Sequence, residues 1–73
     1  MDKESLNFTI YCIGIMAESL GKDEREIYNL MQKGGIIDDY IVPCFDVLHT
    51  FSRNYIIEDL TNLMKKKELL TVE

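Results

Sequence analysis

An apolar stripe near the start of the chain restricts the fold more than any other feature. Its members recur at alternating spacings of four and three residues: Leu6, Ile10, Ile13, Ala17 and Leu20. This spacing places side chains on one face of a helix and predicts a helix over about residues 4–20. Further apolar residues widen the face, so we expect the helix to be central in a bundle or covered by a second chain. Gly21 follows, where a left-handed residue commonly ends a helix.

A second helix is predicted to begin at the acidic stretch Asp23-Glu24-Arg25-Glu26. This stretch matches a capping box, in which Asp23 accepts from the amide of Glu26 while Glu26 reaches back. Ile27, Leu30 and Met31 then supply a buried face, and Gly34-Gly35 ends the helix.

The third segment, residues 37–50, contains the only proline of the chain, Pro43. Proline lacks an amide donor and clashes with the preceding turn, so it interrupts a helix. Two outcomes stay open: a kink, or a short helix over residues 37–42 followed by a new one from Pro43. The apolar residues keep helical spacing throughout the segment: Ile37, Tyr40, Ile41, Cys44, Val47 and Leu48.

A fourth helix is predicted over about residues 55–67, with Lys65-Lys66-Lys67 in its last turn. The short polar connector Ser52-Arg53-Asn54 predicts that the third and fourth helices are antiparallel neighbours. We expect residues 68–73 to be frayed. Together the segments predict a single all-α domain over residues 1–73, a bundle of about four helices with an ordered core over about 4–67.

Composition narrows the functional classes. A net charge of −5 disfavours nucleic acid as the main partner, because phosphate contacts need a basic surface. The same charge argues against a DNA-binding helix-turn-helix domain. Two cysteines and one histidine are too few for a disulfide scaffold or a metal site of usual composition. No targeting signal or membrane span is evident, which predicts a cytoplasmic protein. We expect no cofactor.

No residue pattern predicts an enzyme. Asp46 and His49 lie three residues apart and share a helix face, where a carboxylate can orient an imidazole. Catalysis would also need a nucleophile and an oxyanion or phosphate site, and none is apparent. The alternative is a small-ligand or metal-binding domain that uses Asp46 and His49 with a carboxylate such as Glu58.

Two stretches resemble the signature of a family of small uncharacterised bacterial proteins that carry a domain of unknown function. They are Phe45-Asp46-Val47-Leu48-His49-Thr50 and Tyr55-Ile56-Ile57-Glu58-Asp59-Leu60. Residues 8–13 and 26–31 are similar to the first two helices of that family, so the resemblance covers most of residues 8–64. The chain departs from the family pattern at Gly14, Ile15, Pro43 and Phe51. Ile15 and Phe51 are therefore predicted to be exposed apolar contacts.

The resemblance implies no established activity. Genes of the family are often neighbours of a second small protein that resembles ADP-ribosyltransferase folds. This implies a toxin–antitoxin-like pair in which the present chain is the neutralising partner, and the product of a neighbouring gene is its target.

Our hypothesis is a non-enzymatic protein-interaction module, with a homodimer as an open possibility. Tyrosines are enriched at interfaces because they combine large contact area with low entropic cost. The predicted patch lies on the third and fourth helices and comprises Tyr40, Asp46, His49, Thr50, Tyr55, Glu58 and Asp59.

Overall fold

The computed structural model describes residues 2–70, and the elements in this range are all helical. They are α1 (Lys3–Leu20), α2 (Glu24–Lys33), the π-helix η1 (Ile37–Ile41), α3 (Phe45–Leu48) and α4 (Arg53–Lys66). The predicted all-α class is confirmed. The third segment is split rather than kinked, since η1 ends before Pro43 and α3 begins after it.

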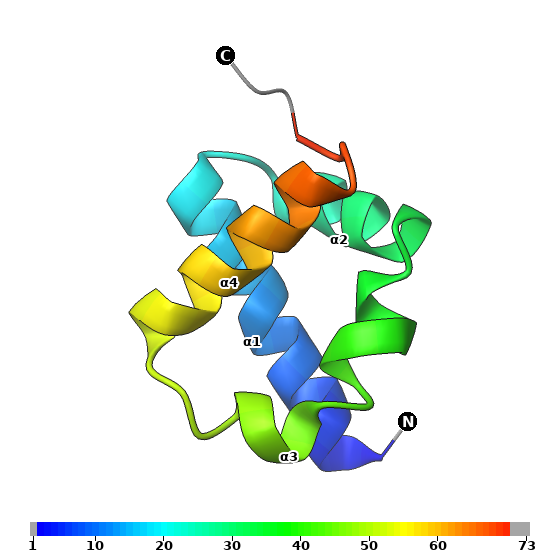
Figure 1. Cartoon of the computed structure of the whole chain (residues 1–73), viewed down its shortest axis with the longest axis vertical. Helices are drawn as coiled ribbons and strands as arrows, with labels where there is room; N and C mark the ends of the chain where they lie inside the picture. Colours follow the sequence, from blue (N-terminus) through cyan, green and yellow to red (C-terminus); the bar gives the residue numbers. More distant parts are fainter. Residues whose placement is uncertain (1, 71–73) are drawn as a thin grey trace.

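Helix α1 is the centre of the bundle, because α2, η1 and α4 all pack on it (Figure 1). The prediction that the third and fourth helices are antiparallel neighbours is wrong. Helix α3 is a single turn of four residues whose only buried side chain is Leu48, so it offers no face along which α4 could lie. Helix α4 packs on α1 instead.

Local hydrogen bonds explain where the helices begin and end. Asp2 caps α1 by accepting from the amide of Ser5 at 2.7 Å, and Gly21 ends α1 at φ 65°, as predicted. The predicted capping box of α2 is wrong, because the Asp23 side chain accepts no capping bond and Glu26 pairs with Lys22 at 3.2 Å. The side chain of Glu26 therefore pairs with the nearby ammonium group of Lys22, in place of the backbone amide that a capping box would use.

The start of α4 is set by Ser52, whose hydroxyl accepts from the amide of Tyr55 at 3.2 Å. Two of the three residues expected to form the polar connector, Arg53 and Asn54, therefore belong to the first turn of α4. The observed helix begins two residues before the predicted one.

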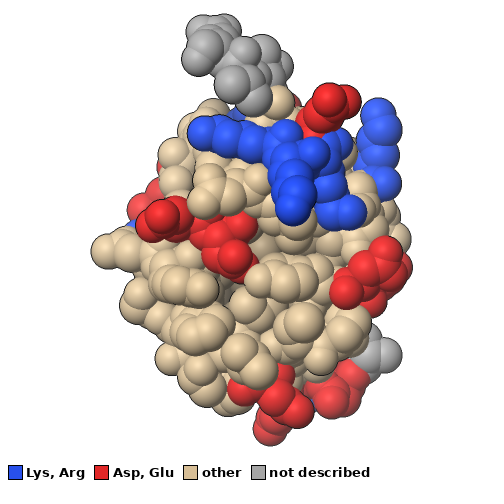
Figure 2. Space-filling model, in the orientation of Figure 1, with Lys and Arg blue, Asp and Glu red and all other residues tan. Residues whose placement is uncertain are grey.

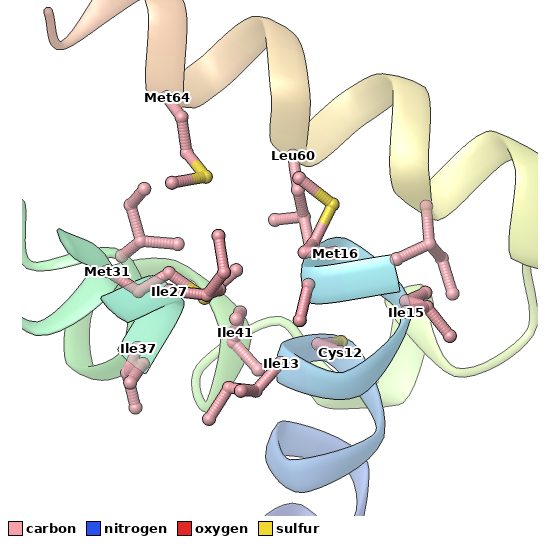
Figure 3. Packing of buried hydrophobic residues seen from close by; sticks show 13 residues of the cluster. Cys12, Ile13, Ile15, Met16, Ile27, Met31, Ile37, Ile41, Leu60 and Met64 are labelled. Atoms are coloured by element: carbon pink, nitrogen blue, oxygen red, sulfur yellow. The ribbon is translucent and has the colours of Figure 1, made fainter. Parts of the chain in front are cut away.

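The core lies between α1, α2, η1 and α4 and is rich in isoleucine and methionine (Figure 3). The buried face of α1 is rotated from the predicted stripe. Ser5, Thr9, Cys12 and Met16 are buried, whereas Leu6 and Ile10 are 46% and 54% exposed. The buried Thr9 hydroxyl donates to the Ser5 carbonyl at 2.8 Å, which removes much of the cost of burying it.

Ile15 is buried, so the prediction that it is an exposed contact is wrong. It lies beneath α4 in Figure 3, and it belongs to the hydrophobic cluster that α4 closes through Ile56, Leu60 and Met64. The face of α1 that carries Ile15 is therefore covered by a neighbouring helix of the same chain.

The end of the described chain is packed rather than frayed. Glu68 adopts φ 60°, and the amide of Leu69 donates to the Met64 carbonyl at 2.9 Å, a Schellman-type helix end. Leu69 and Leu70 pack against the core. The predicted fraying is wrong for residues 68–70, and residues 71–73 lie outside the described residues.

Candidate functional site

The predicted patch divides into two groups, the first of which joins η1 to α4. Tyr40 on η1 donates from its hydroxyl to Oδ2 of Asp59 on α4 at 2.5 Å. Tyr55, Glu58 and Asp59 share one face of α4, and with Asn62 they line an open depression of about 140 Å³. Four residues of the predicted patch therefore meet in one place.

The electrostatics of this group fix the role of Tyr40. The hydrogen bond to Asp59 raises the pKa of the Tyr40 phenol above its ordinary value of 10.0, and partial burial and the negative charge of Asp59 raise it further. The phenol is therefore protonated at neutral pH and acts as a hydrogen-bond donor. A base or nucleophile would require the opposite shift.

The second group lies on α3 and just after it, and its polar atoms are used locally. Nδ1 of His49 donates to the Phe45 carbonyl at 2.8 Å, and the imidazole stacks on the Phe45 ring with centroids 4.7 Å apart. The Thr50 hydroxyl donates to the Val47 carbonyl at 2.7 Å. These bonds complement the C-terminal carbonyls of a short helix.

Asp46 and His49 share a helix turn but do not form the pair that their spacing suggests. Within residues 2–70, neither side chain belongs to an ion pair. The same part of the chain contains no group of three or more His, Cys, Asp or Glu side chains that could hold a metal ion. The alternative of a metal-binding domain built on Asp46, His49 and Glu58 thus finds no ligand cluster there.

The two cysteines occupy different environments. Cys12 is fully buried, and burial raises the pKa of its thiol to about 12. Cys44 is half-buried, and the two are not joined by a disulfide. The raised pKa keeps the Cys12 thiol protonated at neutral pH.

An exposed aromatic pair connects the two groups. Phe51, between α3 and α4, contacts Tyr55 with ring centroids 4.4 Å apart. The exposed fractions are 37% for Phe51 and 51% for Tyr55, so the predicted exposure of Phe51 is confirmed. We call the predicted patch together with Phe51 the α3–α4 surface; it comprises Tyr40, Asp46, His49, Thr50, Phe51, Tyr55, Glu58 and Asp59.

Charge is distributed unevenly around this surface. On the face shown in Figure 2, lysine and arginine gather at the end of the molecule where α4 ends, and much of the opposite half is uncharged. The last turn of α4 contributes Lys65 and Lys66 to the basic end. Of the acidic members of the α3–α4 surface, Asp46 and Glu58 are exposed.

Sequence reasoning selected Tyr40 and Asp59 separately and missed the bond between them. The two residues are 19 positions apart and lie on elements that meet through a tertiary contact, for which one sequence carries no signal. It also missed the exposure of Leu6 and Ile10, because a helix with apolar residues on most sides does not indicate which side its neighbours cover.

The fold and the site define a small all-α domain with exposed aromatic side chains and without a metal-ligand cluster in residues 2–70. The chain belongs to the family described as Protein of unknown function (DUF3791), whose model matches residues 7–67. This confirms the resemblance to a family with a domain of unknown function. Neither a curated protein nor a solved structure matches the chain. In the described part of the chain, no helix has the length and apolar character that a bilayer crossing requires.

Proposed function

We propose that the protein is a non-enzymatic interaction module that binds a partner protein through the α3–α4 surface. The observation that carries this proposal is the exposed Phe51–Tyr55 pair beside the Tyr40–Asp59 bond. Aromatic side chains dominate the energetics of protein interfaces when they enter a pocket on the partner. Exposure of the two aromatic rings to water is unfavourable, and burial of the rings against a partner would contribute favourable free energy to binding.

The geometry supports a preformed binding surface. Tyr40 holds Asp59 at one side of the depression, and Phe51 restricts Tyr55 at the other. Side chains that are ordered before binding lose less conformational entropy when the complex forms. The exposed carboxylates Asp46 and Glu58 favour a partner whose facing surface is basic.

The finer form of the proposal follows from the family resemblance. The protein acts in the cytoplasm as the neutralising member of a toxin–antitoxin-like pair, and its partner is the product of a neighbouring gene. Within residues 2–70, Asp46 and His49 form no ion pair, which is compatible with a protein that neutralises its partner by binding.

Co-purification from a strain that expresses the chain with its neighbouring genes tests this proposal. Tagged wild-type protein should retain the neighbouring gene product in a one-to-one ratio through size-exclusion chromatography. Tyr55→Asp should lose it, whereas Tyr28→Asp should keep it, because Tyr28 is similarly exposed at 44% but lies on α2. Equal retention by both variants would reject the α3–α4 surface, and no stoichiometric partner for the wild type would reject the proposal.

A further inference from the structure

The apolar stripe of α1 is only half covered in the monomer. Ile13 and Ala17 are buried, at 8% and 6% exposure, while Leu6 and Ile10 of the same stripe are 46% and 54% exposed. Helix α2 has ten residues and is about 15 Å long, whereas α1 has eighteen residues and is about 27 Å long. Helix α2 therefore cannot cover the whole length of α1. Tyr11, at 43% exposure, adjoins the open part.

Gly14 leaves the backbone of α1 bare on the same side. It lies one turn after Ile10, and a Cβ built on it would meet no described atom within 4 Å. Glycine inside a helix costs about 0.5–1 kcal/mol relative to alanine. Packing within the chain does not require this glycine, but a second helix that approaches α1 closely would benefit from the missing side chain.

Opposite charges lie on α1 beyond the two ends of this open face. Lys3 and Glu18 are fifteen residues apart, about 22 Å along the helix, and both are exposed. Glu18 pairs with Arg53 at 3.2 Å, yet its side chain remains 76% exposed. If two copies of α1 lay antiparallel, Lys3 of each copy would face Glu18 of the other. A parallel arrangement would place like charges together.

We propose that two copies of the chain form a homodimer through antiparallel packing of α1 about a two-fold axis near Ile10. In this register the Ile10 side chains of the two copies meet at the axis, and Leu6 of each copy lies over Gly14 of the other. Two Lys3–Glu18 pairs flank the apolar contact. The residues of this interface, Leu6, Ile10 and Gly14 of α1, are not members of the α3–α4 surface, through which the partner protein is proposed to bind.

The charge pairs set the register, while the apolar contact supplies most of the affinity. Exposed ion pairs contribute little each, typically below about 1 kcal/mol, but like charges in the same positions are unfavourable. The open face is smaller in area than a standard protein–protein interface, so we expect a dissociation constant on the order of micromolar.

Sedimentation equilibrium from micromolar to millimolar chain concentration tests the dimer. The wild type should pass from one to two chain masses of 8.5 kDa each. Ile10→Glu should weaken association at least about tenfold. Val47→Glu should not, although Val47 is 58% exposed, because it lies on α3. Circular dichroism should show that both variants remain folded.

A charge exchange tests the register. Lys3→Glu and Glu18→Lys should each weaken the dimer. The double variant should restore the affinity of the dimer, although this variant also lacks the Glu18–Arg53 pair. A wild type that stays at one chain mass at millimolar concentration would overturn the proposal. Equal association of Ile10→Glu and Val47→Glu would also overturn it. If the double variant associates no more tightly than the single variants, the antiparallel register is wrong.

Discussion

The hydroxyl of Tyr40 donates a hydrogen bond of 2.5 Å to the carboxylate of Asp59, and this bond joins η1 to α4 across 19 residues of sequence. Both elements pack on α1, so the bond links two segments that each contact the central helix. It also fixes one wall of the depression at the α3–α4 surface. The bond therefore contributes both to stability and to the proposed binding site.

Tyr40→Phe should lower the free energy of unfolding by about 1 kcal/mol, because it leaves a partly buried carboxylate without its donor. Urea denaturation measures the change. Tyr55→Phe is the matched control, since the Tyr55 hydroxyl makes no hydrogen bond with any residue from 2 to 70. An equal loss in both variants would show that the bond adds nothing to stability.

The raised pKa of Tyr40 predicts a dependence of stability on alkaline pH. Its pKa in the folded protein lies above the ordinary value of 10.0, so the stabilisation is complete below that pH. It is lost as the pH rises through the raised pKa. A titration of phenolate absorbance should show a late step in the wild type that Tyr40→Phe lacks. Identical curves would contradict the assignment.

The helix starts predict different effects for two residues at the N-cap position. Ser52→Ala should cost about 1 kcal/mol, because the Ser52 hydroxyl satisfies the amide of Tyr55. Asp23→Ala should cost clearly less, since the Asp23 side chain makes no capping bond. Thermal unfolding of the two variants compares these losses of stability directly. A larger loss for Asp23→Ala than for Ser52→Ala would indicate that Asp23 caps α2, as the sequence predicted.

The cysteines should differ in their reaction with a thiol reagent. Cys12 is fully buried, and its thiol has a pKa of about 12, so it should react only when the chain unfolds. Cys44 is half-buried and should be modified in the folded protein. Mass spectrometry of peptides after brief labelling distinguishes the two. Modification of Cys12 at the rate of Cys44 would show that the core around α1 opens readily.

Hydrophobic periodicity was sufficient to predict α1, α2 and α4 and most of their bounds, whereas the third segment forms two short elements in place of one long helix. The stripe of α4 and the glycine after α1 are local signals, and the structure keeps both. The interruption at Pro43 is equally local, because it follows from the missing amide and the ring itself.

Contacts between elements could not be predicted in the same way. In α1, apolar residues occur on most sides, so the sequence did not reveal that Ser5 and Thr9 face the core while Leu6 and Ile10 face water. Thr9 can be buried because its hydroxyl bonds to the helix itself. At the site, the sequence supplied Tyr40 and Asp59 but not their contact, which depends on how η1 and α4 are placed on α1.

Site-specific photo-crosslinking tests the central claim, binding through the α3–α4 surface, most directly. A photoreactive amino acid replaces Phe51 in one protein and Tyr28 in another, and both are expressed with the neighbouring genes. We predict that the probe at position 51 crosslinks a neighbouring gene product and that the probe at position 28, on α2, does not. Crosslinking at position 28 alone, or at neither position, would contradict the account.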